Sequence, residues 1–344
     1  MAGIEDVAKL AGVSTATVSR ALSGKNHVSD KARLKVEKAA AELGYVASSS
    51  AYTLATGRNR NIGVVMPYID RWFFGAFLES AESALVEAGY DLTLYNLSGG
   101  SAQREKIFNE FLLRQRVDAV LAVAVAPSAS ELDLLNRMKK PILAIGGHID
   151  GARSLVMDDR AAGRLATEHL ISLGHTRIAN INGLESSDKE FNQPNQRHNG
   201  YVDALKAAGL EVKPNWTARA DFTLQSAYVV AKQMLGDPHN APTAIFCNSD
   251  EMAFGAIMAA KDLGLQVPAD VSVIGIDNHD MSEFFELTTV NQRVRGQGSR
   301  AVEILLNLLD DPNLDQHPNI EEQYDWSAEL LVRGSTARPP HSSR

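Results

Sequence analysis

A stretch of small, hydroxyl-bearing residues near the amino end carries groups that could read DNA bases. In "GVSTATVSRALSG", residues 12–24, the apolar side chains recur at helical spacing and would turn inward at Val18, Ala21 and Leu22. The outward face then offers short donors and acceptors and one longer side chain, at Thr15, Ala16, Thr17, Ser19 and Arg20. A helix that lies in the major groove reads base edges with such groups. An ordinary helical hairpin has the same turn, and a bare Gly-Val-Ser sequence favours that alternative.

A second set of polar residues follows apolar runs in the rest of the chain. Asp277 ends "VSVIGID", and Ser249 and Asp250 follow "AIFCN". Open α/β sheets bind ligands at the carboxyl ends of their strands, so these side chains suit a small polar ligand. The guanidinium of Arg197, in "RHNGY", is a fork of donors that suits hydroxyls or a carboxylate, although no strand end places it with these residues. We expect Asp250 to cap the helix that follows it.

The sequence gives no pattern for enzymatic or metal chemistry. It has no P-loop, and "IGGHIDG" lacks the spacing of a dinucleotide fingerprint. His169 and His175 are six residues apart, which does not place two imidazoles on one helical face. The single cysteine, Cys247, lies in an apolar run and is expected to be a buried structural residue. We therefore expect no enzyme, no cofactor and no metal site.

The elements that must position these residues change character along the chain. Residues 4–44 read as three short helices, with Ser14 as a helix cap and Leu34, Val36 and Leu43 among the residues that supply apolar surface. Residues 46–61 are rich in Ser, Thr and Ala and read as a linker. Short apolar runs such as "IGVVMP" and "PILAIGG" then alternate with helical segments, and the same alternation begins again at "RIANING". This indicates two doubly wound parallel sheets with a ligand cleft between them.

The charge distribution separates the helical segment from the rest of the chain. The net charge is -8 over 344 residues, yet residues 1–60 carry nine Lys or Arg against five Asp or Glu. Such asymmetry is typical of a nucleic-acid-binding module on an acidic body. The chain has neither a signal-peptide pattern nor an apolar run long enough to span a bilayer, so we expect a cytoplasmic protein without membrane partners.

The extended pattern resembles the LacI/GalR family of bacterial transcription regulators. "IEDVAKLAGVSTATVSRALSGKNHVSDKARLKVEKAAAELGY" follows the family's headpiece without a gap, and "RHNGY", "SDEMAFGA" and "PADVSVIGID" follow in the family's order. The resemblance implies an all-α helix-turn-helix headpiece plus an α/β periplasmic-binding-protein-like core of two doubly wound parallel-sheet subdomains. It also implies a homodimeric repressor that binds pseudo-palindromic double-stranded operator DNA and is controlled by a small-molecule effector, which we expect to be a sugar or polyol.

The expected domain boundaries follow from the same alignment of motifs. The headpiece would span residues 1–45, the hinge 46–60 and the core 61–336, before a frayed tail at 337–344. Within the core we expect an N-subdomain at about 61–174 and 290–322 and a C-subdomain at about 175–289 and 323–336.

The resemblance also assigns candidate site residues. Base contacts would come from Thr15, Ala16 and Arg20, and phosphate contacts from Thr17 and Ser19. Tyr45 at the end of the headpiece and Leu54 in the hinge would also contact DNA. The hinge departs from the family, because "YVASSSAYTL" replaces the usual proline, asparagine and arginine at Ala47, Ser48 and Tyr52. The effector residues would be Trp72, Phe73, Phe74, Asp158, Arg197, Phe222, Ser249, Asp277 and Gln292.

The same sequence features also fit other kinds of protein. A cytosolic sugar-binding protein with an incidental helical amino end would share the cleft, and so would an enzyme that uses the cleft acids. The effector could induce or corepress, and sugar phosphates, nucleosides or a phosphoprotein partner also fit the pattern. The residues after "LLVRG" contain no leucine heptad, so we expect a dimer and not a tetramer.

Overall fold

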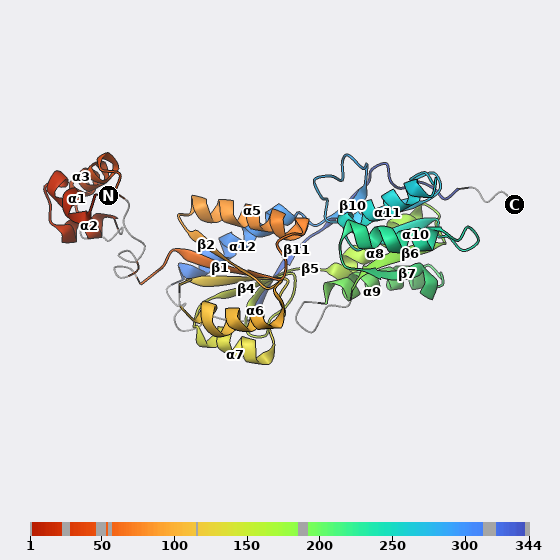
Figure 1. Ribbon diagram of the computed structural model, residues 1–344, viewed down its shortest axis with the longest axis horizontal. Coiled ribbons are helices and arrows are strands. Elements are labelled where there is room, and N and C mark those ends of the chain that lie inside the picture. Colours follow the sequence, from red (N-terminus) through yellow and green to blue (C-terminus); the bar gives the residue numbers. More distant parts are fainter. Residues whose placement is uncertain are drawn as a thin grey trace.

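The computed structural model describes residues 2–22, 28–45, 53, 57–114, 116–184, 192–311 and 321–340. Figure 1 shows a small helical headpiece at the amino end, followed by a core of two α/β subdomains arranged in a row. Among the described residues, no helix has both the length and the apolar composition needed to cross a membrane.

The headpiece packs three helices around a small apolar centre. These are α1 (Ile4–Ala11), α2 (Thr15–Leu22) and α3 (Asp30–Glu42), and Val7, Val18 and Val36 are fully buried between them. Gly12 ends α1 at φ 67°, a left-handed conformation that glycine adopts without steric cost. The prediction that Leu34 supplies apolar surface to the headpiece core is wrong, because Leu34 is 66% exposed on α3.

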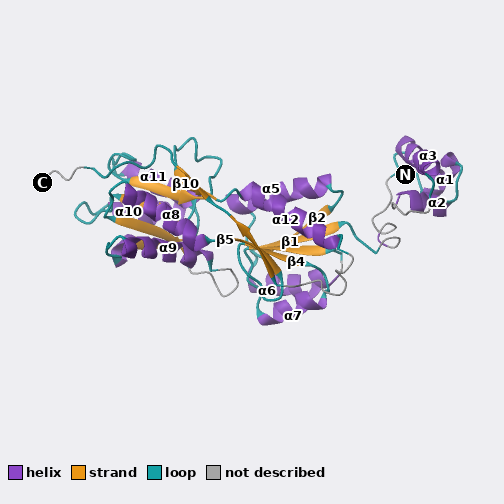
Figure 2. Ribbon diagram, turned by 180° about the vertical axis from the view of Figure 1, so that it is seen from behind, coloured by secondary structure: helices purple, strands orange, loops and turns teal. Residues whose placement is uncertain are grey.

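The N-subdomain is a six-stranded parallel sheet with helices on both faces. The strand order is β11-β5-β4-β3-β1-β2. Helices α5 and α12 cover one face and α6 and α7 the other (Figure 2). The bounds are β1 Asn61–Met66, α5 Trp72–Glu87, β2 Asp91–Asn96, α6 Gly100–Lys106, η1 Ile107–Phe111, η2 Leu112–Arg114, β3 Ala119–Val123, α7 Ala129–Arg137, β4 Ile142–Ile145, β5 Arg153–Met157, α12 Val294–Leu309 and β11 Glu322–Trp326.

The C-subdomain repeats the same layering. Its strand order is β12-β10-β9-β8-β6-β7, with only β12 antiparallel to its neighbour. Helices α8 and α9 lie on one face and α10 and α11 on the other. The bounds are α8 Asp159–Ser172, β6 Ile178–Gly183, α9 Gln193–Ala207, η3 Pro214–Trp216, β7 Thr217–Ala220, α10 Leu224–Leu235, β8 Ala244–Cys247, α11 Asp250–Asp262, β9 Ser272–Ile276, β10 Thr288–Asn291 and β12 Glu329–Leu331.

The boundary expected near residue 174 is wrong, because α8 belongs to the C-subdomain. Two glycines explain this: a Cβ on Gly163 would lie 2.1 Å from the Arg197 carbonyl oxygen, and one on Gly200 would lie 2.0 Å from that of Arg160. Only glycine permits this close approach of the two helix backbones, so α8 packs on α9. The chain therefore crosses to the C-subdomain directly after β5.

The other two crossings also differ from the expected positions. Strand β10 pairs with β9, so the chain returns to the N-subdomain between Asn291 and Val294. Strand β11 pairs with β5 in the N-subdomain, and the last crossing lies between Trp326 and Glu329 instead of at 322–323. Three crossovers thus connect the subdomains at the base of the cleft.

The tail is anchored at the point where fraying was expected. His175 Nε2 lies 2.8 Å from the carbonyl oxygen of Ala337, whose N–H donates to Ser272 Oγ at 3.0 Å. His169 lies 2.9 Å from Thr336 Oγ1, so both histidines hold the end of the chain against the C-subdomain. Residues 341–344 lie outside the described residues.

Candidate functional site: an effector cleft and a DNA-reading helix

Helix α2 presents the face that the sequence predicted. Thr15, Ala16 and Arg20 are exposed, while Thr17 and Ser19 are half-buried. The Thr17 hydroxyl lies 2.9 Å from Ser14 Oγ, and the Thr17 N–H donates to the same oxygen at 3.2 Å. Thr17 thus takes part in the cap of α2, while Thr15, Ala16 and Arg20 are exposed to solvent.

The structure describes only one of the other two predicted DNA-contacting residues, Tyr45 and Leu54. Tyr45 is half-buried against the headpiece centre, and its N–H donates to the Ala40 carbonyl at 2.9 Å, so the ring helps to close the end of α3. Leu54, with the altered hinge sequence at Ala47, Ser48 and Tyr52, lies outside the described residues.

A cavity of about 320 Å³ lies between the two subdomains at the carboxyl ends of their strands. Its walls come from both halves of the core, which suits a ligand that binds them together. Most of the predicted effector residues line it: Phe73, Phe74, Arg197, Phe222, Ser249, Asp277 and Gln292.

A buried ion pair, Arg197 with Asp159, lines this cavity. Arg197 Nε donates to Asp159 Oδ1 at 2.7 Å, and its Nη1 donates to the Asn248 carbonyl at 2.6 Å. Both side chains are less than a tenth exposed. Burial raises the pKa of the Asp159 carboxyl, and the Arg197 guanidinium opposes that rise. Burial likewise works against the charge on Arg197, but the carboxylates of Asp159 and Asp277 raise the pKa of its guanidinium.

Asp277 provides a second polar centre next to this pair. Its carboxylate accepts from Gln292 Nε2, while Gln297 Nε2 donates to the Gln292 carbonyl at 2.8 Å. Burial raises the pKa of Asp277 well above its usual range, and the charge of Asp250 adds to the rise while Arg197 opposes it. The site therefore alternates carboxylates with guanidinium and amide donors, a pattern that suits a ligand rich in hydroxyls.

The backbone at the cavity wall is unusually constrained. Ala124, Phe222 and Asp277 line the cavity and have φ values of 52°, 64° and 133°, in the region that favours glycine. Residues without glycine's freedom adopt such angles only where the surrounding structure imposes them, and this occurs preferentially at ligand sites.

Two predicted effector residues have other positions. Asp158 does not line this cavity; it caps α8 by accepting from the Ala161 N–H at 2.8 Å and borders an adjacent hollow of about 580 Å³. Trp72 is also absent from the cavity wall. Its indole N–H donates to Asp280 at 3.0 Å, and its ring stacks on His279 with centroids 4.7 Å apart.

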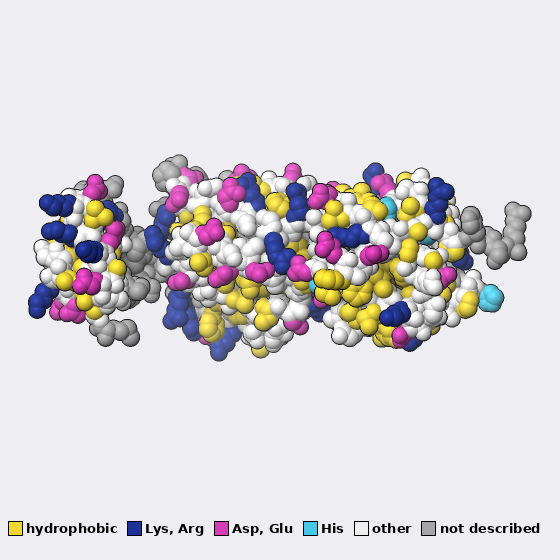
Figure 3. All heavy atoms as spheres, turned by 90° about the horizontal axis from the view of Figure 1, so that it is seen from above, with side chains coloured by type: hydrophobic (Ala, Val, Ile, Leu, Met, Phe, Trp, Pro, Cys, Tyr) yellow, Lys and Arg dark blue, Asp and Glu magenta, His cyan; other side chains and the backbone are white. Residues whose placement is uncertain are grey.

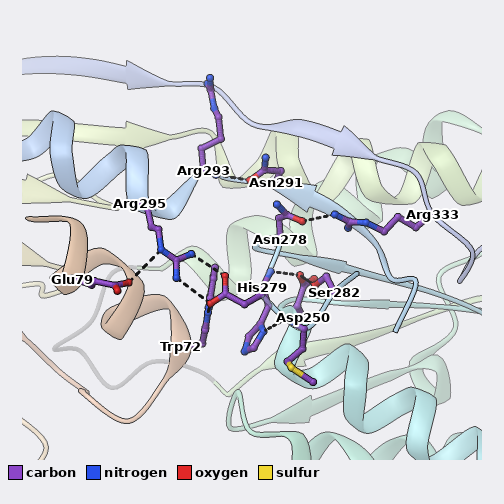
Figure 4. A network of polar contacts seen from close by, with 12 residues as sticks. Trp72, Glu79, Asp250, Asn278, His279, Ser282, Asn291, Arg293, Arg295 and Arg333 are labelled. Atoms are coloured by element: carbon purple, nitrogen blue, oxygen red, sulfur yellow. Dashed lines mark hydrogen bonds and ion pairs between the residues drawn. The ribbon is translucent and has the colours of Figure 1, made fainter. Parts of the chain in front are cut away.

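Trp72 belongs to a bridge between the subdomains, shown in Figure 4. Asp280 of the C-subdomain accepts from Trp72 of α5 and from both terminal nitrogens of Arg295 of α12, at 2.9 and 3.0 Å. Arg295 also contacts Glu79 at 3.3 Å. These donors lower the pKa of Asp280, which keeps the bridge charged. Because the bridge joins α5 and α12 to the C-subdomain, it depends on how the two halves are oriented.

Asp250 does not cap α11 as expected. Ser249 takes that position and accepts from the Met252 N–H at 3.3 Å. The fully buried Asp250 carboxylate instead accepts from the His279 N–H and the Ser282 hydroxyl, at 2.9 and 2.7 Å (Figure 4). It also accepts from the Thr289 hydroxyl at 2.7 Å. Asp250 thus fixes the loop that carries Asp277 and Asp280.

Sequence reasoning missed several residues of the cavity wall. Among them are the polar or aromatic residues Tyr68, Arg71, Asp159, Gln193, Asp221, Glu251 and Gln297. Asp159 could have been found from "MDDRAAG", where the first acid caps the helix and the second starts it. Burial raises the pKa of Glu251, and Arg71 and the Trp72 N–H oppose the rise. No group of His, Cys, Asp and Glu within the described part of the chain could hold a metal ion.

Comparison with known proteins agrees with this architecture. Residues 3–48 match the family model "Bacterial regulatory proteins, lacI family", and residues 167–336 match "Periplasmic binding protein-like domain". The HTH-type transcriptional repressor PurR of Vibrio vulnificus (strain CMCP6) is 33% identical over 343 residues, which cover 98% of this chain and 99% of that protein.

Two solved structures extend the similarity to the whole fold. The Lac repressor dimer bound to operator and the anti-inducer ONPF superposes with a TM-score of 0.78 and 29% identity, covering 98% of this chain and 99% of that one. A complex of the transcriptional regulator CelR with cellobiose gives a TM-score of 0.69 and 27% identity, covering 97% and 100%.

Proposed function

We propose that a sugar or polyol in the cavity between the subdomains controls the affinity of this protein for operator DNA. The proposal starts from its family: the chain belongs to the lacI family of bacterial regulatory proteins and is a DNA-binding transcriptional repressor. The observation that supports the effector class most directly is a set of two hydrogen-bonded pairs that line the cavity, Asp159 with Arg197 and Asp277 with Gln292, which together offer donors and acceptors.

The DNA-binding half of the proposal rests on α2. Arg20 would reach the edge of a guanine, and Thr15 and Ala16 would contact neighbouring bases, because their side chains are exposed on the same face. Thr17 and Ser19 would lie close to phosphates. We propose that two chains form a dimer and place two such helices on the half-sites of a pseudo-palindromic operator. A dimer of this kind would act in the cytoplasm.

The effector half rests on the composition of the cavity. Vicinal hydroxyls both donate and accept, so they can bridge a carboxylate and a guanidinium that lie side by side. Phe73, Phe74 and Phe222 offer apolar rings to the C–H face of a sugar. The same rings would also stack on a flat heterocycle, which makes a nucleoside the second candidate.

The coupling between effector binding and DNA binding rests on the bridge and the crossovers. A ligand that contacts both walls would stabilise one orientation of the subdomains relative to others. That orientation determines whether Asp280 can meet Trp72 and Arg295 together, and in a dimer it would set the separation of the two headpieces. The effector would therefore change operator affinity through a difference in subdomain orientation.

A combined binding experiment tests the proposal. Sugars, polyols and nucleosides are screened by thermal shift of the full chain, and each ligand that binds is then added to a gel shift with the chain's own upstream DNA. We expect a sugar or polyol to raise the melting temperature and to change operator affinity. A nucleoside that alone does both would replace the proposed effector class.

The rival of a sugar-binding protein without DNA function is tested in the same assay. Arg20→Ala should abolish the preference for the upstream DNA, while Lys206→Ala, which removes an exposed cation from α9, should leave it intact. An intact chain that shows no preference for that DNA at low salt would refute DNA recognition by α2.

A further inference from the structure

The amino ends of three neighbouring strands in the N-subdomain gather positive charge. Strands β4, β3 and β1 lie side by side in the sheet. The segments that lead into them, 58–60, 116–118 and 139–141, contain five basic residues and one acid. We call this surface the basic edge: Arg58, Arg60, Arg116, Lys139 and Lys140.

Hydrogen bonds hold the three segments together. The Asn61 side chain donates to the Arg116 carbonyl at 3.0 Å, and the Val120 N–H donates to the Pro141 carbonyl at 2.9 Å. The Asp118 carboxylate accepts from the backbone N–H groups of Asn59 and Arg60, at 2.9 and 2.7 Å. The basic edge is therefore part of the rigid sheet.

The one acid among these segments does not expose its charge. Asp118 is 2% exposed, and its two oxygens are occupied by the backbone at residues 59 and 60. Arg58 is paired with Asp310 at 3.2 Å. Arg60, Arg116 and Lys139 are exposed. The edge thus presents cations to solvent. The chain after Arg60 is acidic as a whole, with 25 Lys or Arg against 37 Asp or Glu.

The position of the basic edge identifies its partner. The carboxyl ends of the same strands form the cleft, so the basic edge lies at the opposite end of the subdomain and faces the headpiece (Figure 1). Figure 3 shows Lys and Arg side chains gathered at the end of the core nearest the headpiece. Only residues 46–56 separate Tyr45 from Gly57, a span of about 40 Å even at full extension. A duplex bound by the headpiece is therefore tethered at this end of the core, on the side of the basic edge.

We propose that the basic edge is a second DNA-contacting surface, which binds backbone phosphates of the duplex held by the headpiece. The inference rests on the proposed DNA recognition by α2. Arg and Lys side chains at a fixed edge can meet phosphates without reading bases, so this surface adds affinity and salt dependence but no sequence preference. It also makes operator affinity sensitive to subdomain orientation, because the edge moves with the core.

The test compares the full chain with the double variant Arg116→Gln/Lys139→Gln, whose changes are at exposed positions. Operator affinity is measured by fluorescence anisotropy from 50 to 300 mM salt. The slope of log affinity against log salt should become shallower by about 0.9 for each phosphate that the variant no longer neutralises. The matched control is Lys206→Gln/Lys261→Gln, which removes two exposed cations of the C-subdomain and should leave the slope unchanged.

Dissociation kinetics distinguish direct phosphate binding from electrostatic steering. If the edge binds phosphates, the edge variant should dissociate faster, whereas an edge that only steers the duplex would change association alone. A slope equal to that of the control, or a change confined to association, overturns the proposal and leaves an acidic protein as the occupant to seek. Failure of DNA recognition itself has a different signature: the unmodified chain would show no operator preference, and Arg20→Ala would change nothing.

Discussion

Replacement of Arg197 by Met should separate the structural role of the cavity's ion pair from its role in binding. The change removes the guanidinium that lies 2.7 Å from Asp159 and 2.6 Å from the Asn248 carbonyl, and leaves a buried carboxylate without a counter-charge. Removal of one partner of a buried pair costs about 3–5 kcal/mol in the free energy of unfolding. The side-chain volume is largely kept, so a cavity contributes little to the loss.

The double variant Arg197→Met/Asp159→Val should recover most of that free energy. Apolar side chains of similar volume replace buried ion pairs at little cost, because the desolvation penalty of both charges disappears. Neither variant should bind the effector. Arg164→Met is the control, because it breaks an exposed pair with Glu168 on the same helix and should change stability by no more than about 0.5 kcal/mol.

Urea denaturation at pH 7 and pH 5 measures these differences. In Arg197→Met the pKa of Asp159 rises further, so the folded state binds a proton that the unfolded state lacks. Stability should therefore recover partly as the pH falls. A loss below about 1 kcal/mol for Arg197→Met, or a double variant no more stable than the single one, would refute the account of the pair.

Three further changes test other parts of the structure. Burial raises the pKa of Asp277, so its contribution to the free energy of unfolding is present at low pH and is lost as the pH rises through the folded pKa, by at most about 1.4 kcal/mol per pH unit. Asp277→Asn should flatten that decline in urea denaturation between pH 4 and 7. An unchanged pH profile would contradict the raised pKa of Asp277. Asp280→Ala removes the bridge to Trp72 and Arg295 and should change operator affinity about two- to fivefold in anisotropy titrations, since exposed pairs contribute up to about 1 kcal/mol. This change in operator affinity should exceed that caused by Glu79→Gln. If the two variants change the affinity equally, the bridge does not couple subdomain orientation to DNA binding. Gly200→Ala should lower the melting temperature, because the added Cβ would lie 2.0 Å from the Arg160 carbonyl oxygen. Gly75→Ala in α5 is the control and should not lower it, because no atom from outside α5 lies within 4 Å of the added Cβ. Equal melting temperatures would show that the α8–α9 contact adjusts freely.

The headpiece and the layered core could be predicted from the sequence because their signals are local. Apolar spacing predicts Val18 and Ala21 inside, and both are buried. Strand-end positions predict Asp277 and Ser249 at the cavity, because the carboxyl ends of parallel strands converge. The resemblance to a known family supplies Arg197, which no local pattern assigns to the cavity.

Other features depend on contacts between distant residues and could not be predicted in this way. Helix α8 follows a strand of one subdomain but packs on the other through Gly163 and Gly200, a pairing that periodicity does not encode. The sequence predicts that Trp72 faces the ligand, but the position of Asp280 directs its indole to the bridge. The positive φ angles of Asp277 and Phe222 could not be predicted from the sequence either, because neither residue is a glycine.

The most direct test of the central claim is operator affinity measured with and without a ligand that binds the cavity. The full chain is titrated onto fluorescent duplex from its own upstream region in the presence of the sugar or polyol found by thermal shift, beside Asp277→Asn. We predict that the ligand changes the affinity of the unmodified chain at least fivefold, and that Asp277→Asn binds the duplex but no longer responds. A ligand whose binding requires Asp277 but which leaves operator affinity unchanged would contradict the account.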